Sequence, residues 1–496
     1  MRIIQGHENI KQSAADILSD ESGIEPGFPE RVFLPENPEE IREALHQAKD
    51  KGMQVVISSG LTGITGGGVP DKGNAVISLS KMKGIKESGY PSDSAIQLTC
   101  MPGTTLDEIE EYLSEKHRGR FLFPPDPTEQ SANLGGAAAN DASGARSFKY
   151  GSIRNFITGM KVILPKGGMI DIDRKSVVFR KNRCSFPDDT SNEYRVEIPE
   201  TGFSGIKNTA GYFCKRDMDL IDLFIGSEGT IGIIGELRIR CIIRPEFISG
   251  LSFLPDHESA FGFADMLRKH SKVSALEFFD SNSLEVLKEA DTSRRIEVSI
   301  PKDMNTAVFW EYAGEGPEDI PDFIEDYLKH SGSSFDTTWS GMDEDEADRL
   351  RAFRHSVPEG INTRINRYRQ HFPEIHKLST DSALPEEHFN DYYSECISII
   401  RDYSLNYAGF GHLGDYHIHF NILPSDHKEY EAAKDCYSRL IDTALKYNGS
   451  VSAEHGIGRL KRNYFRRMYS DAEYNGMLDI KRALDPDLLL NPGIMF

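Results

Sequence analysis

The sequence predicts an α+β protein built from more than one domain. Three observations indicate this class: the chain has 496 residues, a helix, a strand, a loop and a second strand follow one another near its start, and amphipathic helices are mixed with short strands from about residue 246 to 440. A single hydrophobic core stops growing at roughly 250–300 residues, so this length suits two or three domains. We expect units at residues 1–245, 246–440 and 441–496.

The helix signals are strongest near the N-terminus. Residues 37–52 predict a helix because Asn37 suits the N-cap, Glu40 suits the third helical position, apolar residues recur on one face, and Gly52 ends the pattern. The buried strands MQVVIS and AVISLS follow, with a glycine-rich loop between them. A second helix is predicted over residues 105–119.

Further along, the pattern alternates between strands and poorly packed segments. Residues 123–151 are rich in Pro, Gly, Ala and Asn and have too little bulk for a core of their own, so they must pack against another part of the chain. KVILPKGGMIDI predicts a strand, a turn and a strand, and the polar residues 174–219 predict a surface excursion. The segment IGSEGTIG is expected between two apolar strands.

Composition excludes several classes of partner. Lys and Arg number 57 against 78 Asp and Glu, which gives a formal net charge of −21, so the surface repels nucleic acid and anionic membranes. The six cysteines form no C-x-x-C pair, which disfavours a disulfide framework, a thiolate zinc site and an iron–sulfur cluster. No stretch approaches the roughly 18 apolar residues of a membrane helix and no targeting segment is recognisable, so we expect a cytoplasmic protein.

Three glycine-rich clusters lie in the first half of the chain. The first places Gly60, Gly63, Gly66, Gly67 and Gly68 directly after a strand, where successive backbone N–H groups can form an anion-binding nest. It matches neither the dinucleotide-binding Rossmann motif nor a P-loop. The other two clusters are ANLGGAAAN and IGSEGTIG. Each is weak alone because glycine turns are common, but together they favour a long cofactor that carries phosphate groups.

The C-terminal half contains a histidine-rich hairpin, GFGHLGDYHIHFN. If Gly414 and Asp415 form a two-residue loop, His412 lies opposite His417, and the period of two places His419 on the same face. A lone strand histidine is more often a structural residue than a ligand. Three imidazoles would share one face, and convergence with a separate pair, Glu454 and His455, changes that balance.

A separate pair, Glu454 and His455, adds a carboxylate. Two histidines and a carboxylate are a common ligand set for a divalent zinc or manganese ion with open positions. The spacing differs from the H-E-x-x-H pattern, so the sequence does not favour a metallopeptidase.

Ten motifs in order resemble the FAD-linked 2-hydroxy acid dehydrogenases, flavoproteins of the vanillyl-alcohol-oxidase type. These are SSGLTGITGGGVP, FPPDPTEQSANLGGAAANDASG, KYGSIRNFITGMKVILPKGG, KNTAGY, LFIGSEGTIGII, FRH, STDSALP, GHLGDYHIHFN, SAEHGIGRLK and NPG. The resemblance implies a PCMH-type FAD-binding domain of two α/β subdomains, a substrate domain with an antiparallel sheet and flanking helices, and a C-terminal segment that returns to the flavin.

The resemblance also implies roles for individual residues. It implies His455 as the catalytic base, Arg354 as the clamp of the substrate carboxylate, and Tyr416 and His417 as pocket residues. The implied metal ligands are His412, His419 and Glu454. The implied contacts to FAD, held without a covalent bond, are Ser59, Gly60, Thr62, Gly63, Gly66, Gly67, Pro125, Asp126, Gly135, Gly136, Asn140, Gly144, Gly151, Gly226, Glu228, Gly229, Thr230 and Asn491.

The implied reaction is metal-assisted oxidation of a D-2-hydroxy acid, such as D-lactate, glycolate or 2-hydroxyglutarate, to a 2-oxo acid. Electrons would pass to an acceptor or partner subunit that the sequence does not identify, and a homodimer is compatible with the resemblance. Two alternatives stay open: a flavin transferase similar to alkylglycerone-phosphate synthase, against which Glu454 argues, and a flavin-binding subunit with altered catalysis.

The sequence departs from the family pattern at three places. Ser58 and Ser59 stand in the first glycine loop where an Arg-Gly-Gly-Gly-like string is usual. Tyr416 and His417 replace the expected glycine and asparagine of the hairpin, and Pro358 stands where some members have a second substrate-binding side chain. We therefore expect a narrowed or recharged pocket and a substrate that differs from the best-known ones.

Overall fold

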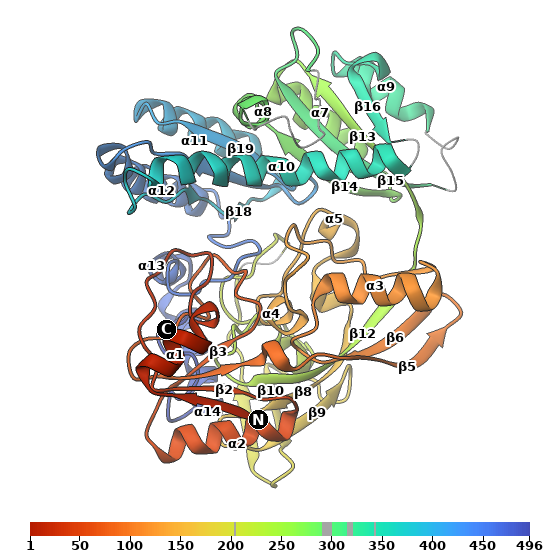
Figure 1. Ribbon diagram of the computed structural model, residues 1–496. Coiled ribbons are helices and arrows are strands. Elements are labelled where there is room, and N and C mark those ends of the chain that lie inside the picture. The colour runs from red at the N-terminus through yellow and green to blue at the C-terminus, as the bar shows by residue number, and fades with distance from the viewer. Residues whose placement is uncertain (203–204, 290–299, 315–320, 342–343) are drawn as a thin grey trace.

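The computed structural model describes residues 1–202, 205–289, 300–314, 321–341 and 344–496. Helices and sheets are mixed throughout, as the predicted α+β class requires (Figure 1). The first half of the chain lies at the bottom of the view, and the cyan and blue helices and strands of the second half lie above it. The blue C-terminal helices return to the lower part.

The first sheet has the order β1-β2-β4-β3, and only β1 runs antiparallel to its neighbour. Its strands are β1 (Arg2–Gln5), β2 (Arg31–Leu34), β3 (Val55–Ser58) and β4 (Ala75–Ser78), with α1 (His7–Ser13) after β1. The predicted helix at 37–52 is α2 (Pro38–Asp50). The Asn37 side chain accepts a hydrogen bond from the Glu40 backbone N–H at 3.0 Å, which is the expected N-cap.

The second sheet is antiparallel, with the order β5-β6-β12-β8-β9 and a short β7 that pairs with β12. Its strands are β5 (Ile85–Ser92), β6 (Ala95–Cys100), β7 (Phe121–Leu122), β8 (Ile157–Ile163), β9 (Met169–Asp173) and β12 (Ile233–Ile243). The predicted hairpin KVILPKGGMIDI forms β8 and β9. The second predicted helix is α3 (Leu106–His117), which a capping box between Thr105 and Glu108 begins.

The segment of small residues contains α4 (Leu134–Ala139) and α5 (Ser147–Tyr150) and packs against other parts of the chain, as expected. A Cβ atom on Gly135 would lie 2.5 Å from Cβ of Pro102, so only glycine permits this approach. The polar excursion carries a small antiparallel sheet of β10 (Arg183–Pro187) and β11 (Glu193–Glu197).

One strand prediction is wrong. The apolar residues before the third glycine cluster form a short helix, α6 (Leu220–Phe224), and all five are buried. A short apolar run that is buried on every side has no periodicity that separates a strand from a helix, which explains the error.

The second half is built on an eight-stranded sheet with the order β16-β13-β15-β14-β19-β20-β17, in which β18 also pairs with β20. Its strands are β13 (Glu246–Leu254), β14 (Val273–Phe279), β15 (Thr306–Gly314), β16 (Thr338–Gly341), β17 (Leu378–Ser379), β18 (Ser382–Ala383), β19 (Tyr407–Gly411) and β20 (His417–Ile422). The helices are α7 (His257–Leu267), α8 (Ser281–Glu289), α9 (Asp322–His330), α10 (Glu344–Arg369), α11 (Phe389–Asp402) and α12 (His427–Lys446).

The histidine hairpin keeps the predicted register but not the predicted loop. Phe410 pairs with His419, and continuing that register places His412 opposite His417. The strands end at Gly411 and His417, and the connection contains a short 3-10 turn with Tyr416 in the left-handed conformation at φ 51°. A two-residue type I′ turn needs positive φ at both central residues, and neither Gly414 nor Asp415 has it.

The C-terminal segment returns to the first half through α13 (Arg462–Met468) and α14 (Asp471–Leu484). Its last residues join the first sheet, where the Val55 N–H donates to Leu489 O and the Asn491 N–H donates to Val55 O. The Asn491 side chain accepts from the Ile57 N–H at 2.8 Å and donates to Glu228 O at 2.6 Å.

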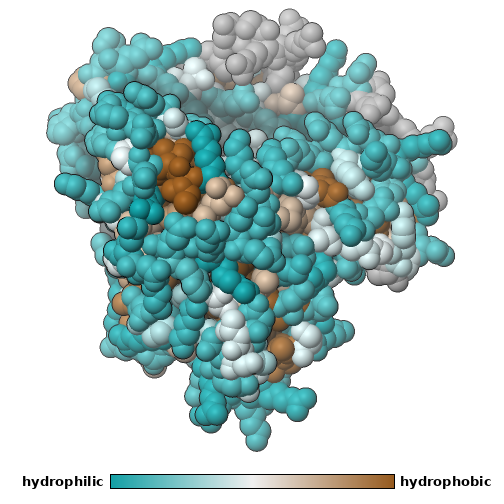
Figure 2. Space-filling view, turned by 60° about the horizontal axis from the view of Figure 1, so that its bottom comes forward, coloured by the Kyte–Doolittle hydropathy of each residue, from teal (hydrophilic) through white to brown (hydrophobic). Residues whose placement is uncertain are grey.

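The surface is largely hydrophilic on the face shown in Figure 2, where hydrophobic residues form small separate groups. The large apolar side chains that are exposed are widely spread in sequence: Ile3, Phe28, Tyr90, Val178, Ile243, Phe372, Leu460 and Leu488. Among the helices described, none combines the length and apolar character needed to cross a bilayer.

We predict that Asp280 makes stability depend on pH. Its carboxylate accepts from the Ser283 N–H at the start of α8, and burial raises its pKa from 3.8 to about 6. Between these values the folded state keeps a proton that the unfolded chain releases, so the free energy of unfolding should fall with rising pH by on the order of 2–3 kcal/mol. In urea titrations from pH 4 to 7, Asp280→Asn should lose this slope.

Asp256 provides the matched control for this experiment. It also accepts a hydrogen bond at a helix start, from Ser259 N–H, and that bond lowers its pKa. Its contribution is present above the unfolded pKa and is lost as the pH falls, so Asp256→Asn should leave the slope above about pH 5 unchanged. An unaltered slope in Asp280→Asn would contradict the assignment.

Candidate functional site

A cavity of about 970 Å³ lies where the glycine loops of the first half meet the second half of the chain. One wall comes from residues 59–68, 127–143 and 227–234, and the other comes from one face of α10, the histidine hairpin and residues 454–464. The volume is at the upper end of the range for ligand pockets, which suits a large cofactor together with a small substrate.

Many of the predicted cofactor contacts line this cavity. They are Ser59, Gly60, Thr62, Gly63, Gly67, Gly135, Gly136, Asn140, Glu228, Gly229 and Asn491. A Cβ atom on Gly63 would meet nothing within 4 Å, so the backbone there faces open space. The Ser59 hydroxyl is buried and has no hydrogen-bond partner among the described residues, so it is available to a ligand.

The other predicted cofactor contacts do not line the cavity: Gly66, Pro125, Asp126, Gly144, Gly151, Gly226 and Thr230. Two of them, Gly144 and Thr230, have other contacts that explain their residue types. A Cβ atom on Gly144 would lie 1.8 Å from the Asp126 carbonyl oxygen, so this glycine allows two loops to touch. The Thr230 hydroxyl donates to Ser227 O at 2.7 Å. These residues shape the loops rather than face the cavity.

Glu228 lines the cavity, but its carboxylate is already engaged. It accepts hydrogen bonds from the backbone N–H groups of Ile457 and Gly458, both at 2.7 Å. Burial raises its pKa to about 7, although these hydrogen bonds oppose the shift. Glu228 therefore ties the third glycine cluster to the chain that follows Glu454 and His455.

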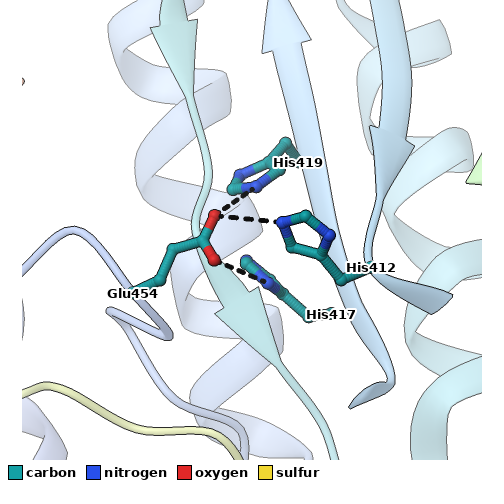
Figure 3. Close-up of side chains that lie close together, drawn as sticks. All are labelled: His412, His417, His419 and Glu454. Atoms are coloured by element: carbon teal, nitrogen blue, oxygen red, sulfur yellow. Dashed lines mark hydrogen bonds and ion pairs between the residues drawn. The ribbon is translucent and has the colours of Figure 1, made fainter. Parts of the chain in front are cut away.

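Three histidines and a glutamate converge beside the cavity (Figure 3). His412 follows β19, His417 and His419 lie on β20, and Glu454 lies in the loop after α12. Glu454 Oε1 is 3.4 Å from His412 Nε2 and 3.2 Å from His419 Nε2, and Oε2 is 4.0 Å from His417 Nδ1. Figure 3 shows the three rings around one side of the carboxylate. The predicted metal ligands are thus brought together.

An oxygen atom lies close to the far-side nitrogen of each of the three rings. His412 Nδ1 is 3.0 Å from Glu277 Oε1, His417 Nε2 is 3.0 Å from Asp381 Oδ1, and His419 Nδ1 donates to the Thr380 carbonyl at 2.8 Å. Oxygen acceptors favour a proton on these nitrogens and leave the other nitrogen with a lone pair. Metal-binding histidines are usually oriented in this way.

The electrostatics of the three imidazoles differ. Burial lowers the pKa of His417 and of His419, which keeps both rings neutral. Burial alone would also lower the pKa of His412, but the charge of Glu454 and the contact with Glu277 outweigh it and raise the value to about 9. His412 thus holds a proton between the carboxylates of Glu277 and Glu454, at the place where a metal ion would bind.

Lys207 is a part of the site that the sequence did not single out. Its Nζ donates to Glu454 Oε2 at 2.7 Å and lies 3.4 Å from His417 Nδ1 and 3.8 Å from Asp415 Oδ2. Ser143 Oγ also donates to Glu454 Oε2, at 3.2 Å. These contacts hold one carboxylate oxygen and leave Oε1 to face the imidazoles. The motif KNTAGY contains Lys207 and was its only signal.

Asp381, which lies between β17 and β18, is a second residue of the site that the sequence did not single out. Its carboxylate is fully buried and lies 3.2 Å from His455 Nδ1, 3.0 Å from His417 Nε2 and 2.7 Å from Lys461 Nζ. Burial opposes ionisation, yet His455 and Lys461 hold the pKa of Asp381 well below its usual range. The motif STDSALP contains Asp381, but nothing local indicated that it would orient two histidines.

The two predicted catalytic residues both line the cavity. His455 is the more open, with 29% of its side chain exposed, and its Nε2 is 3.7 Å from Glu454 Oε1. Arg354, on α10, contacts Glu277 through Nε and Asp126 through Nη1, the latter at 3.4 Å. Sequence reasoning missed Glu277, whose pKa falls to about 2: burial opposes this shift, but Arg354 and His412 outweigh it.

The two predicted pocket residues of the hairpin do not line the cavity, which corrects that expectation. Tyr416 lies beneath the Arg268 guanidinium, 3.8 Å from its ring centroid, and its hydroxyl accepts a hydrogen bond from Arg268. His417 has no exposed surface and belongs to the histidine cluster instead. Tyr416 has a left-handed backbone, and its ring packs against Arg268 and Phe389. Pro358, by contrast, does line it.

Comparisons with known proteins place this site in context. Residues 245–495 match the family described as FAD linked oxidases, C-terminal domain, and residues 29–173 match an FAD binding domain. The chain is 26% identical to D-2-hydroxyglutarate dehydrogenase of Stutzerimonas stutzeri over 94% of this chain and 91% of that protein. It is 25% identical to D-lactate dehydrogenase of Archaeoglobus fulgidus, over 93% and 90% respectively.

Other similarities also span most of this chain. The glycolate oxidase subunit GlcD of Bacillus subtilis is 25% identical over 99% of this chain and 95% of its own length. Among solved structures, p-cresol methylhydroxylase is similar with a TM-score of 0.70 at 14% identity, covering 99% of this chain and 93% of that one. Alkyldihydroxyacetonephosphate synthase has a TM-score of 0.58 at 15% identity, and the match covers 94% of this chain and 76% of that one. These two likenesses concern the fold.

We predict that breaking the buried Asp381–Lys461 pair destabilises the protein. Asp381→Asn leaves the Lys461 ammonium buried without its carboxylate, which costs about 3–5 kcal/mol, whereas removing both charges is far less costly. The double variant with Lys461→Met should therefore recover part of the loss in urea unfolding. Asp487→Asn, at the exposed Lys49 pair, should cost at most about 1 kcal/mol. Equal losses at the two sites would contradict this prediction.

Proposed function

Because the chain belongs to the family of FAD-linked oxidases, we propose that it oxidises a D-2-hydroxy acid to the 2-oxo acid and passes the electrons through FAD to a separate acceptor. The observation that carries the proposal is the convergence of His412, His419 and Glu454 beside His455 and Arg354, at a cavity that glycine loops also line. The substrates in the names of the related dehydrogenases support the choice of substrate class.

The residues of the first half fit an FAD molecule held without a covalent bond. The first glycine loop and Gly135–Gly136 allow a flat, extended ligand to approach the backbone, and Ser59 offers an unpartnered hydroxyl. Bound FAD would supply the acceptor for the hydride from the substrate. Asn491 lines the same wall and holds β3 against Glu228, so it fixes the loop on which the cofactor depends.

The histidine cluster fits a divalent zinc or manganese ion. His412 Nε2 and His419 Nε2 lie 3.4 and 3.2 Å from Glu454 Oε1, where an ion would replace the protons between them, and Lys207 holds the second carboxylate oxygen. A bound ion would lower the pKa of the substrate hydroxyl. The three ligands leave coordination positions for the substrate, as in catalytic zinc sites.

His455 suits the role of general base. The Asp381 carboxylate at Nδ1 favours a proton there and leaves Nε2 to accept the proton of the substrate hydroxyl. Arg354 suits the role of the carboxylate clamp. Glu277 and Asp126 hold its Nε and Nη1, and Nη2 has no acceptor among the described residues, so it can donate to a substrate carboxylate.

The experiment that tests the proposal is anaerobic addition of D- and L-2-hydroxy acids to metal-replete, flavin-loaded protein. The yellow flavin absorption should bleach with a D-2-hydroxy acid and persist with its enantiomer. Protein that binds FAD but bleaches with no member of the panel would favour the transferase or the non-catalytic flavin subunit. Protein that stays colourless with added FAD would remove the proposal altogether.

We predict that His455→Ala slows flavin reduction by about 10²–10⁴-fold, the usual contribution of a general base. Stopped-flow spectroscopy measures the rate, and the bound FAD spectrum should be retained because the cofactor loops are unaltered. The exposed His427, which pairs with Glu374, gives a matched control, since His427→Ala should reduce flavin at the native rate. A native rate in His455→Ala would assign the base to another residue.

A further inference from the structure

We infer that His417 is a fourth ligand of the metal, so that three imidazoles and one carboxylate bind a zinc ion. This inference rests on the metal site of the proposed function and extends it by a residue that the resemblance did not assign to the ion. It also sets how the substrate binds, because a fourth protein ligand removes a coordination position.

The first argument is distance. One donor atom from each of His412, His417, His419 and Glu454 lies within 4.8 Å of the other three. Four donors at about 2.0–2.1 Å from a tetrahedral zinc ion are roughly 3.3 Å apart. The two contacts of Glu454 Oε1, at 3.4 and 3.2 Å, already have this spacing. Shifts of about an ångström at the ends of the side chains would bring His417 into the same arrangement.

The second argument is the orientation of the His417 ring. Asp381 lies 3.0 Å from Nε2, so the proton belongs on Nε2 and the lone pair belongs on Nδ1, the atom that faces Glu454. His412 and His419 are oriented in the same way by Glu277 and the Thr380 carbonyl. The three rings thus share one design, in which a far-side acceptor directs a lone pair to a common point.

The third argument is burial. His417 has no exposed surface and does not line the cavity, so it cannot contact a substrate there. A buried acceptor nitrogen needs a partner. Lys207 Nζ makes only a long contact with Nδ1, at 3.4 Å, whereas it is 2.7 Å from Glu454 Oε2. Lys207 is therefore held mainly by Glu454, and an ion bound at Nδ1 would replace its weaker contact with His417.

Lys207 also explains why the carboxylate binds through one oxygen. Its ammonium and the Ser143 hydroxyl both donate to Glu454 Oε2, which leaves Oε1 as the donor to the ion. The resulting set of three nitrogens and one oxygen favours zinc over manganese or magnesium, which prefer oxygen ligands. The substrate hydroxyl would then bind as a fifth ligand, an expansion that catalytic zinc sites permit, and Arg354 would take the substrate carboxylate.

The experiment compares His417→Asn with the native protein, both loaded with FAD and stripped of metal by a chelator. Zinc affinity is measured by chelator competition, and the coordination number is read from the visible absorption of bound cobalt, which is far stronger in four-coordinate than in six-coordinate sites. We expect His417→Asn to weaken zinc binding by at least about 10–100-fold, because removing even a residue that only hydrogen-bonds to a ligand causes a loss of this size. The visible absorption of bound cobalt should also become weaker.

Two comparison variants separate the outcomes. His419→Asn should lose zinc binding because it removes a ligand of the proposed site, and His427→Asn should behave as the native protein. Loss in His419→Asn with native zinc affinity and native cobalt absorption in His417→Asn would overturn the inference and leave the proposed function intact. A native protein that binds neither zinc nor cobalt would overturn the metal site as well.

A further measurement covers the case in which His417→Asn does not fold. X-ray absorption of the zinc-loaded native protein counts imidazole ligands directly. Three imidazoles support the inference, and two overturn it. His417→Gln gives a second variant with a side chain of similar length and no imidazole, for which the same loss of zinc affinity is expected.

Discussion

The burial of three carboxylates, Glu277, Asp381 and Glu454, in one region of the molecule is the constraint on which the site depends. Charges removed from water must be paired to be tolerated. Arg354 of α10 contacts the first, Lys461 of the C-terminal segment contacts the second, and Lys207 of the first half contacts the third. Neutralising them therefore brings three distant parts of the chain to one place, and the histidines occupy the space between them.

The sequence predicted the elements whose causes are local. Asn37 and Thr105 cap α2 and α3 through neighbouring residues, so both helices could be read from short segments. The apolar run at Leu220–Phe224 was misread because burial on all sides erases periodicity. In the site, the histidines and Glu454 belong to distinctive motifs, whereas Glu277 lies in an apolar strand and gains its meaning only from partners 77 and 135 residues away.

The altered hairpin shows how a family pattern can change without loss of the register. Tyr416 adopts a left-handed backbone, which is costly for a residue with a Cβ atom, and its contacts with Arg268 and Phe389 offset that cost. The ring points away from the cavity, so the substitution at this position leaves the pocket open. The neighbouring change at His417 acts on the cluster instead, where it adds an imidazole that Asp381 orients.

The junction of Asn491 with β3 has a consequence for how the chain is made. Val55 and Ile57 form hydrogen bonds with residues 434 positions later, so β3 gains these partners only after Leu489 and Asn491 have been synthesised. Domains usually fold in order as they are synthesised. Here β3 lacks part of its hydrogen-bond partners until the C-terminal segment has been made. The FAD-binding half thus contains segments that are adjacent in the folded protein but are synthesised far apart in time. Removing residues 489–491 would therefore destabilise its first strands.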